Sequence, residues 1–138
     1  MPDISLDAAR PIVAAARRIA IVGLSPNPMR PSHSVGSYLQ RAGYQIVPVR
    51  PGVDEVLGEP AYPTLAAAAA AGPLDIVDIF RRPDAIGALV PDLLAARPQL
   101  VWMQLGISNE AAADALAAAG IPVVQDHCLK LAHLHWRT

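Results

Sequence analysis

Five short runs of almost uninterrupted apolar residues are the feature that most constrains how this chain folds. They cover residues 19–23, 44–49, 74–80, 100–103 and 121–125. A strand with one exposed face alternates apolar and polar side chains, whereas a strand buried on both faces is apolar along most of its length. The runs therefore predict a mainly parallel sheet that is covered by helices on both faces.

Segments with helical patterns separate these runs. Predicted helices cover residues 6–18, 34–42, 65–71, 83–96 and 129–135, and a further helix, capped by Ser108 or Asn109, ends near residue 119. Residues 50–62 contain several prolines and glycines and predict a long loop or a small extra strand. The alternation predicts an α/β fold, a doubly wound five-stranded sheet, in a single domain over residues 1–138.

Charge and hydropathy exclude several classes of partner. The 138 residues include 11 basic and 12 acidic side chains, a net charge of −1, so a general nucleic-acid-binding protein is not expected. The apolar runs are much shorter than the roughly 20 residues of a membrane-spanning helix, and residues 1–18 lack the order of a secretory signal. We therefore expect no membrane association and a cytoplasmic location.

The loops that follow the predicted strands carry the candidate ligand contacts, because open α/β sheets bind ligands beyond the carboxyl ends of their strands. Four arginines follow three of these strands: Arg30, Arg50, Arg81 and Arg82. The first loop adds three hydroxyl groups, at Ser25, Ser32 and Ser34, and leads into a helix N-terminus. Guanidinium groups and helix N-termini both bind phosphate. The pattern predicts a phosphate-binding loop and a multiply phosphorylated small-molecule ligand; the competing interpretation is that each arginine is solvated on the surface.

The glycine pattern narrows the ligand. Gly23 ends the first strand, but Ser25 and Pro28 occupy the positions where the dinucleotide motif G-x-G-x-x-G has glycine. Arg50 lies near the end of the second strand, where an NAD site has a carboxylate and where an arginine suits a ribose phosphate. Plain NAD is therefore disfavoured, and the 3′-phosphate of coenzyme A and the 2′-phosphate of NADP both remain open.

Six segments together resemble a known family. They cover residues 19–35, 43–49, 57–65, 75–83, 101–107 and 126–130. In this order they resemble the small bacterial and archaeal CoA-binding domain proteins, whose Rossmann-like fold is similar to the CoA-binding domain of succinyl-CoA synthetase α subunits. The resemblance covers nearly the whole chain after residue 18 and implies coenzyme A as the cofactor.

The resemblance also implies roles for individual residues. Those expected to face the diphosphate are Gly23, Ser25, Arg30 and Ser32, with Pro26 in the same loop. Those expected to line the nucleotide end are Val49, Arg50, Phe80 and Arg81. Gln104 and Gly106 are expected near the pantetheine. His33 is either a phosphate contact or an exposed loop residue, and Arg50 stands where family members often have asparagine, which leaves the ribose-phosphate contact open.

Several other side chains are interpreted without a ligand. Cys128, beside His127, is either a reactive thiol or a small buried hydrophobic residue. No metal site is expected, because His133 and His135 are two residues apart and would point in different directions on a helix.

Three residues of the central strands have structural or stacking interpretations. Asp78 is expected to cap the backbone of a neighbouring loop, and Trp102 to belong to the core. Phe80, at the end of its strand, is the candidate for stacking on adenine.

The predicted function is binding of coenzyme A or an acyl-CoA, without evident catalytic residues. One alternative is an NADP-linked reductase or a subunit of an acyl-CoA ligase. Another is a thiol or nucleotide sensor that acts through a partner protein. A homo-oligomer and a partner subunit are both compatible with the sequence.

Overall fold

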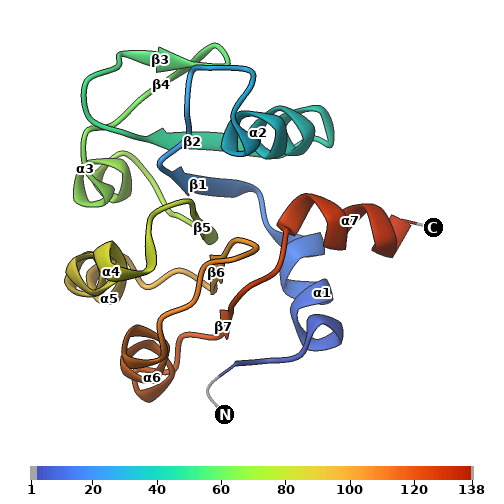
Figure 1. Cartoon of the computed structure of the whole chain (residues 1–138), viewed down its shortest axis with the longest axis vertical. Helices are drawn as coiled ribbons and strands as arrows, with labels where there is room; N and C mark the ends of the chain where they lie inside the picture. The colour runs from blue at the N-terminus through green and yellow to red at the C-terminus, as the bar shows by residue number, and fades with distance from the viewer. Residues whose placement is uncertain (1–2, 138) are drawn as a thin grey trace.

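The computed structural model describes residues 3–137 and has a five-stranded sheet at its centre (Figure 1). The strands are β1 (Arg18–Val22), β2 (Gln45–Val49), β5 (Ile76–Ile79), β6 (Leu100–Met103) and β7 (Val123–Val124). Their order is β2-β1-β5-β6-β7, and every neighbouring pair is parallel. The predicted parallel sheet is therefore confirmed, although its last strand is shorter than predicted.

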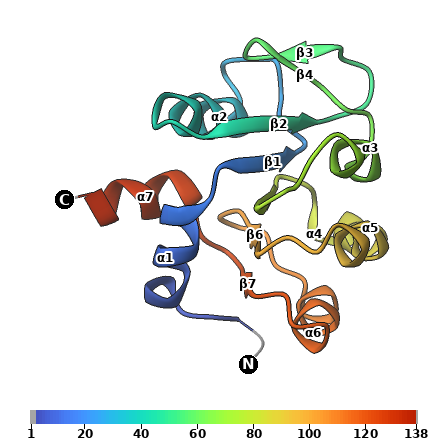
Figure 2. The same ribbon diagram turned by 180° about the vertical axis from the view of Figure 1, so that it is seen from behind.

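Helices cover both faces of this sheet, as Figures 1 and 2 show from opposite sides. One face carries α1 (Leu6–Ala15), α2 (Pro31–Arg41) and α7 (Leu129–Arg137). The other carries α3 (Leu65–Ala70), α4 (Pro83–Ile86), α5 (Val90–Ala96) and α6 (Glu110–Ala118). Two hydrophobic clusters result: Ile19, Ile21 and Trp102 belong to the first face, and Ala20 and Val22 to the second. The doubly wound α/β fold is thus confirmed, as is the core position of Trp102, which is fully buried.

The predicted helix over residues 83–96 is the clearest error. It is divided into α4, a 3₁₀ turn (Gly87–Leu89) and α5. Pro91 has no N–H to donate, and its ring would clash with the carbonyl of Gly87 in a continuous helix. Other helix ends differ less: α1 ends at Ala15, so that Arg18 belongs to β1, and α2 begins at Pro31 rather than Ser34.

Residues 50–62 contain a small antiparallel hairpin of β3 (Glu55–Val56) and β4 (Glu59–Pro60). The two residues between them, Leu57 and Gly58, have φ values of 54° and 78°. Positive φ at both central residues is the geometry of the two-residue turns that fit the twist of a hairpin. After the hairpin the chain returns to the sheet, where the Arg50 N–H donates to the Tyr62 carbonyl at 2.8 Å and so anchors the backbone of Arg50.

Two aspartates, one just before β5 and one within it, behave differently. Asp75 has a structural role, because its Oδ2 accepts hydrogen bonds from the amides of Arg17 and Arg18, both at 2.9 Å. The cap predicted for Asp78 is wrong: this side chain is fully buried, and neither carboxyl oxygen has a hydrogen-bond partner among residues 3–137. Burial raises the pKa of Asp78 well above its ordinary value, so the proton is retained to higher pH.

The sequence predicts no membrane-spanning helix, and the lengths of the helices in the structure bear on this prediction. Within the described residues, none is long and apolar enough to cross a membrane.

Candidate functional site

The site begins at the turn that follows β1. Gly23 has a φ of +87°, and its N–H donates to the carbonyl of Val49, at the end of β2, at 2.8 Å. A Cβ atom at this position would lie 2.5 Å from the carbonyl oxygen of Phe80, which follows β5. Only glycine combines the positive φ with this close approach. The turn therefore draws the ends of three neighbouring strands together.

Hydrogen bonds from side chains shape the loop between Gly23 and α2. The Ser25 amide donates to Ser32 Oγ at 2.9 Å, and the Asn27 amide donates to Ser25 Oγ at 3.1 Å. Both serines are buried. A hydroxyl that accepts a hydrogen bond still has its own proton to donate. Each serine can therefore hold the loop in place and donate to a ligand at the same time.

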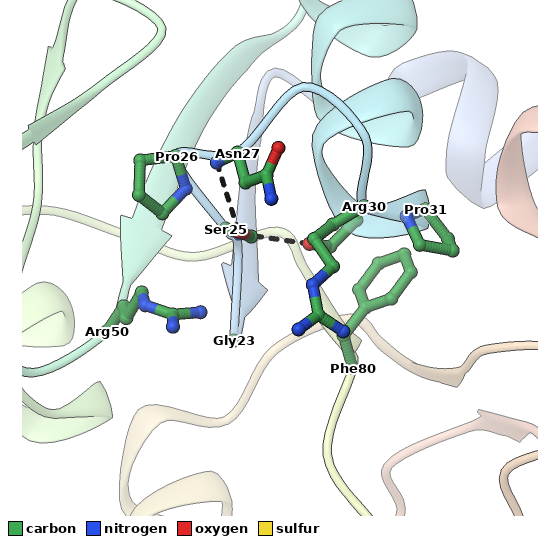
Figure 3. A pocket seen from close by; sticks show the side chains of 9 residues that line it. Gly23, Ser25, Pro26, Asn27, Arg30, Pro31, Arg50 and Phe80 are labelled. Atoms are coloured by element: carbon green, nitrogen blue, oxygen red, sulfur yellow. Dashed lines mark hydrogen bonds between the residues drawn. The ribbon is translucent and has the colours of Figure 1, made fainter.

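A cavity of about 570 Å³, here called the arginine cavity, lies between this loop and the strand ends (Figure 3). The predicted site residues that line it are Gly23, Ser25, Pro26, Arg30, Ser32, Arg50 and Phe80. Asn27 and Pro31 also line it and were missed; their only signal in the sequence is their place in the same loop. β1 lies between β2 on one side and β5 on the other, so the order of the strands reverses direction at β1. The cavity lies at the carboxyl end of β1, at this reversal, which is the expected binding position in an open α/β sheet.

Positive charge dominates the arginine cavity. Figure 3 shows Arg30 and Arg50 on opposite sides of Gly23, with their guanidinium groups extending into the space between them. Neither guanidinium has a hydrogen-bond or ion-pair partner among residues 3–137, and no carboxylate lines the cavity. Helix α2 begins here at Pro31, so the positive end of its dipole adds to the field. The cavity is therefore suited to an anion with several oxygen acceptors.

A second cavity of about 340 Å³, the edge cavity, shares Gly23, Arg50 and Phe80 with the first. Val49 and Arg81 line it, together with Pro51 and Arg82. Arg82 is exposed and has a weak surface ion pair with Asp84, at 3.5 Å. The two cavities bring together arginines from three separate loops, as the sequence predicted.

The remaining candidate residues lie outside both cavities. Gln104 is buried, and its Oε1 accepts a hydrogen bond from the Leu129 amide at 3.1 Å, which secures the start of α7. The Gly106 amide donates to Asp126 Oδ1 at 2.6 Å. His33 is half-buried in the first turn of α2 and does not line the arginine cavity. These contacts leave the predicted ligand roles of the three residues untested.

The cysteine and histidine residues near the C-terminus lie in two places: His127, Cys128 and His135 line one hollow, and His133 faces Tyr38. Cys128 is half-buried. His133 Nδ1 forms a hydrogen bond with the Tyr38 hydroxyl at 2.5 Å. Within residues 3–137, no group of three or more His, Cys, Asp and Glu side chains is arranged to hold a metal ion.

Comparison with known proteins gives consistent matches over most of the chain. A family model described as a CoA binding domain matches residues 17–134. The Bacillus subtilis (strain 168) protein YneT is 41% identical over 122 residues, which are 88% of this chain and 89% of YneT. The solved structure of Thermus thermophilus cell-free ID.343 is 40% identical, with a TM-score of 0.90 over 96% of this chain and 98% of its own. A hypothetical protein from Pyrococcus horikoshii OT3 is 28% identical, with a TM-score of 0.92 over 100% and 96%.

Proposed function

The chain belongs to the CoA binding domain family, and we propose that it acts as a single domain that binds coenzyme A, free or as a thioester. In this proposal Arg30, Ser25 and Ser32 hold the diphosphate in the arginine cavity. The adenosine end lies toward the edge cavity, where Phe80 stacks on the adenine and Arg50 or Arg81 meets the ribose phosphate. The protein serves as a binding module, and none of these residues is assigned a catalytic role.

One observation carries this proposal: Arg30 and Arg50 face a shared cavity, and within residues 3–137 their guanidinium groups have no anionic partner. Surface arginines commonly form weak ion pairs with nearby carboxylates, as Arg82 does with Asp84. Two cations in one cavity repel each other unless an anion lies between them. A diphosphate supplies that charge and matches the bidentate geometry of guanidinium groups.

Titration calorimetry with coenzyme A, 3′-dephospho-CoA and NADP tests the proposal. We expect coenzyme A to bind, and Arg50→Ala to weaken that binding about 10- to 100-fold, because a charge-assisted hydrogen bond is lost. Arg41→Ala is the matched control: Arg41 is exposed at the end of α2, its Nε donates to the Ser37 carbonyl, and it lines neither cavity. Absence of binding at millimolar coenzyme A, or equal losses in the two variants, would refute the proposal.

The same titrations identify which phosphate Arg50 contacts. If it meets the 3′-phosphate, Arg50→Ala weakens coenzyme A strongly and 3′-dephospho-CoA little, because the two changes remove the same interaction. If it meets the diphosphate, both ligands lose affinity equally. Tighter binding of NADP than of coenzyme A would instead favour the NADP-linked alternative.

A further inference from the structure

Two apolar hollows continue from the arginine cavity toward α1 and α7. The first, here called the central groove, has a volume of about 520 Å³ and shares Pro31 and Phe80 with the arginine cavity. The second, the outer groove, has a volume of about 370 Å³ and shares Leu105, Cys128 and Leu131 with the central groove. Because each hollow shares lining residues with the next, the three adjoin one another; together they are here called the trough, which has a cationic end and an apolar end.

Two large apolar side chains are exposed to solvent at the apolar end of the trough. Leu105, in the loop after β6, is 63% exposed, and Leu131, on α7, is 58% exposed. Both line the central and the outer groove. Leu6 and Trp136 complete the apolar walls of the outer groove. Exposed leucines that line the same two hollows, rather than standing singly on the surface, are a feature of ligand-binding grooves.

The walls of the outer groove are held by the fold. The Trp136 ring packs edge-to-face against the buried ring of Trp102, at a centroid distance of 6.5 Å. Arg10, on α1, donates from Nη2 to the Trp136 carbonyl at 2.9 Å, which ties α1 to α7. The groove is therefore a preformed hollow between two anchored helices, and binding there requires little ordering of the protein.

We propose that this protein prefers coenzyme A thioesters with an apolar acyl chain over free coenzyme A, and that the acyl chain occupies the outer groove. The inference rests on the proposed function. With the adenosine end in the edge cavity, the other end of a ligand whose phosphates occupy the arginine cavity extends through the adjoining central groove to Cys128. Beyond Cys128 the walls are formed mainly by apolar side chains, with Asp7, His127 and His135 also among the lining residues. The group attached to the sulfur is therefore recognised there mainly by burial of apolar surface.

Calorimetric titration with free coenzyme A and with its acetyl, butyryl, hexanoyl and octanoyl thioesters tests this inference. We expect affinity to rise about two- to fourfold for each methylene that enters the groove, because burial of a methylene is favourable and one side of the groove is open. Leu6→Ser, on the outer wall, is expected to reduce this gain. Leu134→Ser is the matched control, because Leu134 is also a partly exposed leucine, lies on α7 and lines neither groove; it is expected to retain the gain.

The outcomes separate this inference from the function on which it rests. If free coenzyme A and all thioesters fail to bind, the proposed function itself is refuted. If coenzyme A binds and the thioesters bind no more tightly, only the acyl preference is refuted. A third outcome is that sedimentation shows a dimer, that Leu6→Ser dissociates this dimer, and that thioesters bind no more tightly than free coenzyme A. This result would assign the outer groove to a second copy of the chain and overturn the inference. Should Leu6→Ser unfold the protein, Ala132→Leu, which fills the same groove from α7, provides the second variant.

Discussion

Replacement of Gly23 by alanine is the most direct test of how the site is built. The added Cβ would lie 2.5 Å from the Phe80 carbonyl oxygen, a backbone atom that cannot move independently, and the residue would keep a φ of +87°. The left-handed conformation costs about 1–2 kcal/mol for a residue with a Cβ, and overpacking costs about 1–3 kcal/mol. We therefore expect Gly23→Ala to lower the free energy of unfolding by about 2–5 kcal/mol.

Gly120→Ala separates the two contributions. Gly120 has a φ of +82°, but a Cβ there would have no atom within 4 Å. This control should lose only the conformational part, about 1–2 kcal/mol. Urea unfolding of both variants and the parent chain measures the difference, provided that the m-values agree. Equal losses at the two positions would refute the argument that the contact with Phe80 requires glycine at the turn.

Three further predictions concern stability. Burial raises the pKa of Asp78 above its ordinary value of 3.8, so the stability that its protonated carboxyl contributes is full below pH 3.8 and is lost as pH rises through the raised pKa. Asp78→Asn should flatten this decline in the free energy of unfolding, measured by urea titration at several pH values. An unchanged dependence of the unfolding free energy on pH would contradict this prediction. Burial, and secondarily the charge of Arg137, lower the pKa of His133 from 6.5, so the free energy of unfolding should fall as pH drops from 6.5 through the lowered pKa. A pKa of 6.5 or above for His133, measured by NMR titration, would show this prediction to be wrong. Asn109→Ala should lower the free energy of unfolding by about 1 kcal/mol or more, because the Asn109 side chain caps α6 and also donates to the Pro83 carbonyl. Thr64→Ala, which removes only the cap of α3, should lower it by less in the same urea assay. A larger loss for Thr64→Ala than for Asn109→Ala would count against this prediction.

The sheet and the position of the site were predictable because both depend on local patterns. Strands buried on two faces require continuous apolar runs, and the carboxyl ends of parallel strands lie at one edge of the sheet. Arg30 and Arg50 follow two such strands, so the sequence alone places them near each other. The break between α4 and α5 also has a local signal in the sequence, because Pro91 lacks the N–H donor that a continuous helix needs.

The partners of individual polar side chains could not be predicted in the same way. Gln104 follows β6 at the ligand-binding edge, yet its Oε1 accepts a hydrogen bond from Leu129, 25 residues away. Asp78 was expected to find a backbone donor, but its strand neighbours in register are Ile21 and Trp102, and its side chain remains unpaired within residues 3–137. Such outcomes depend on how distant segments pack, and no spacing in the sequence encodes them.

The overall charge and the local charge of this chain lead to opposite expectations, and the local charge is the relevant one for a small ligand. A net charge of −1 argues against binding an extended polyanion, which interacts with much of a protein surface. A diphosphate occupies only a few ångströms, and beyond about 10 Å charges are largely screened at physiological salt. Within that range the arginine cavity presents Arg30, Arg50 and the start of α2, and no lining carboxylate. The same chain can therefore lack a nucleic-acid-binding surface and still have a cavity suited to a phosphorylated small molecule.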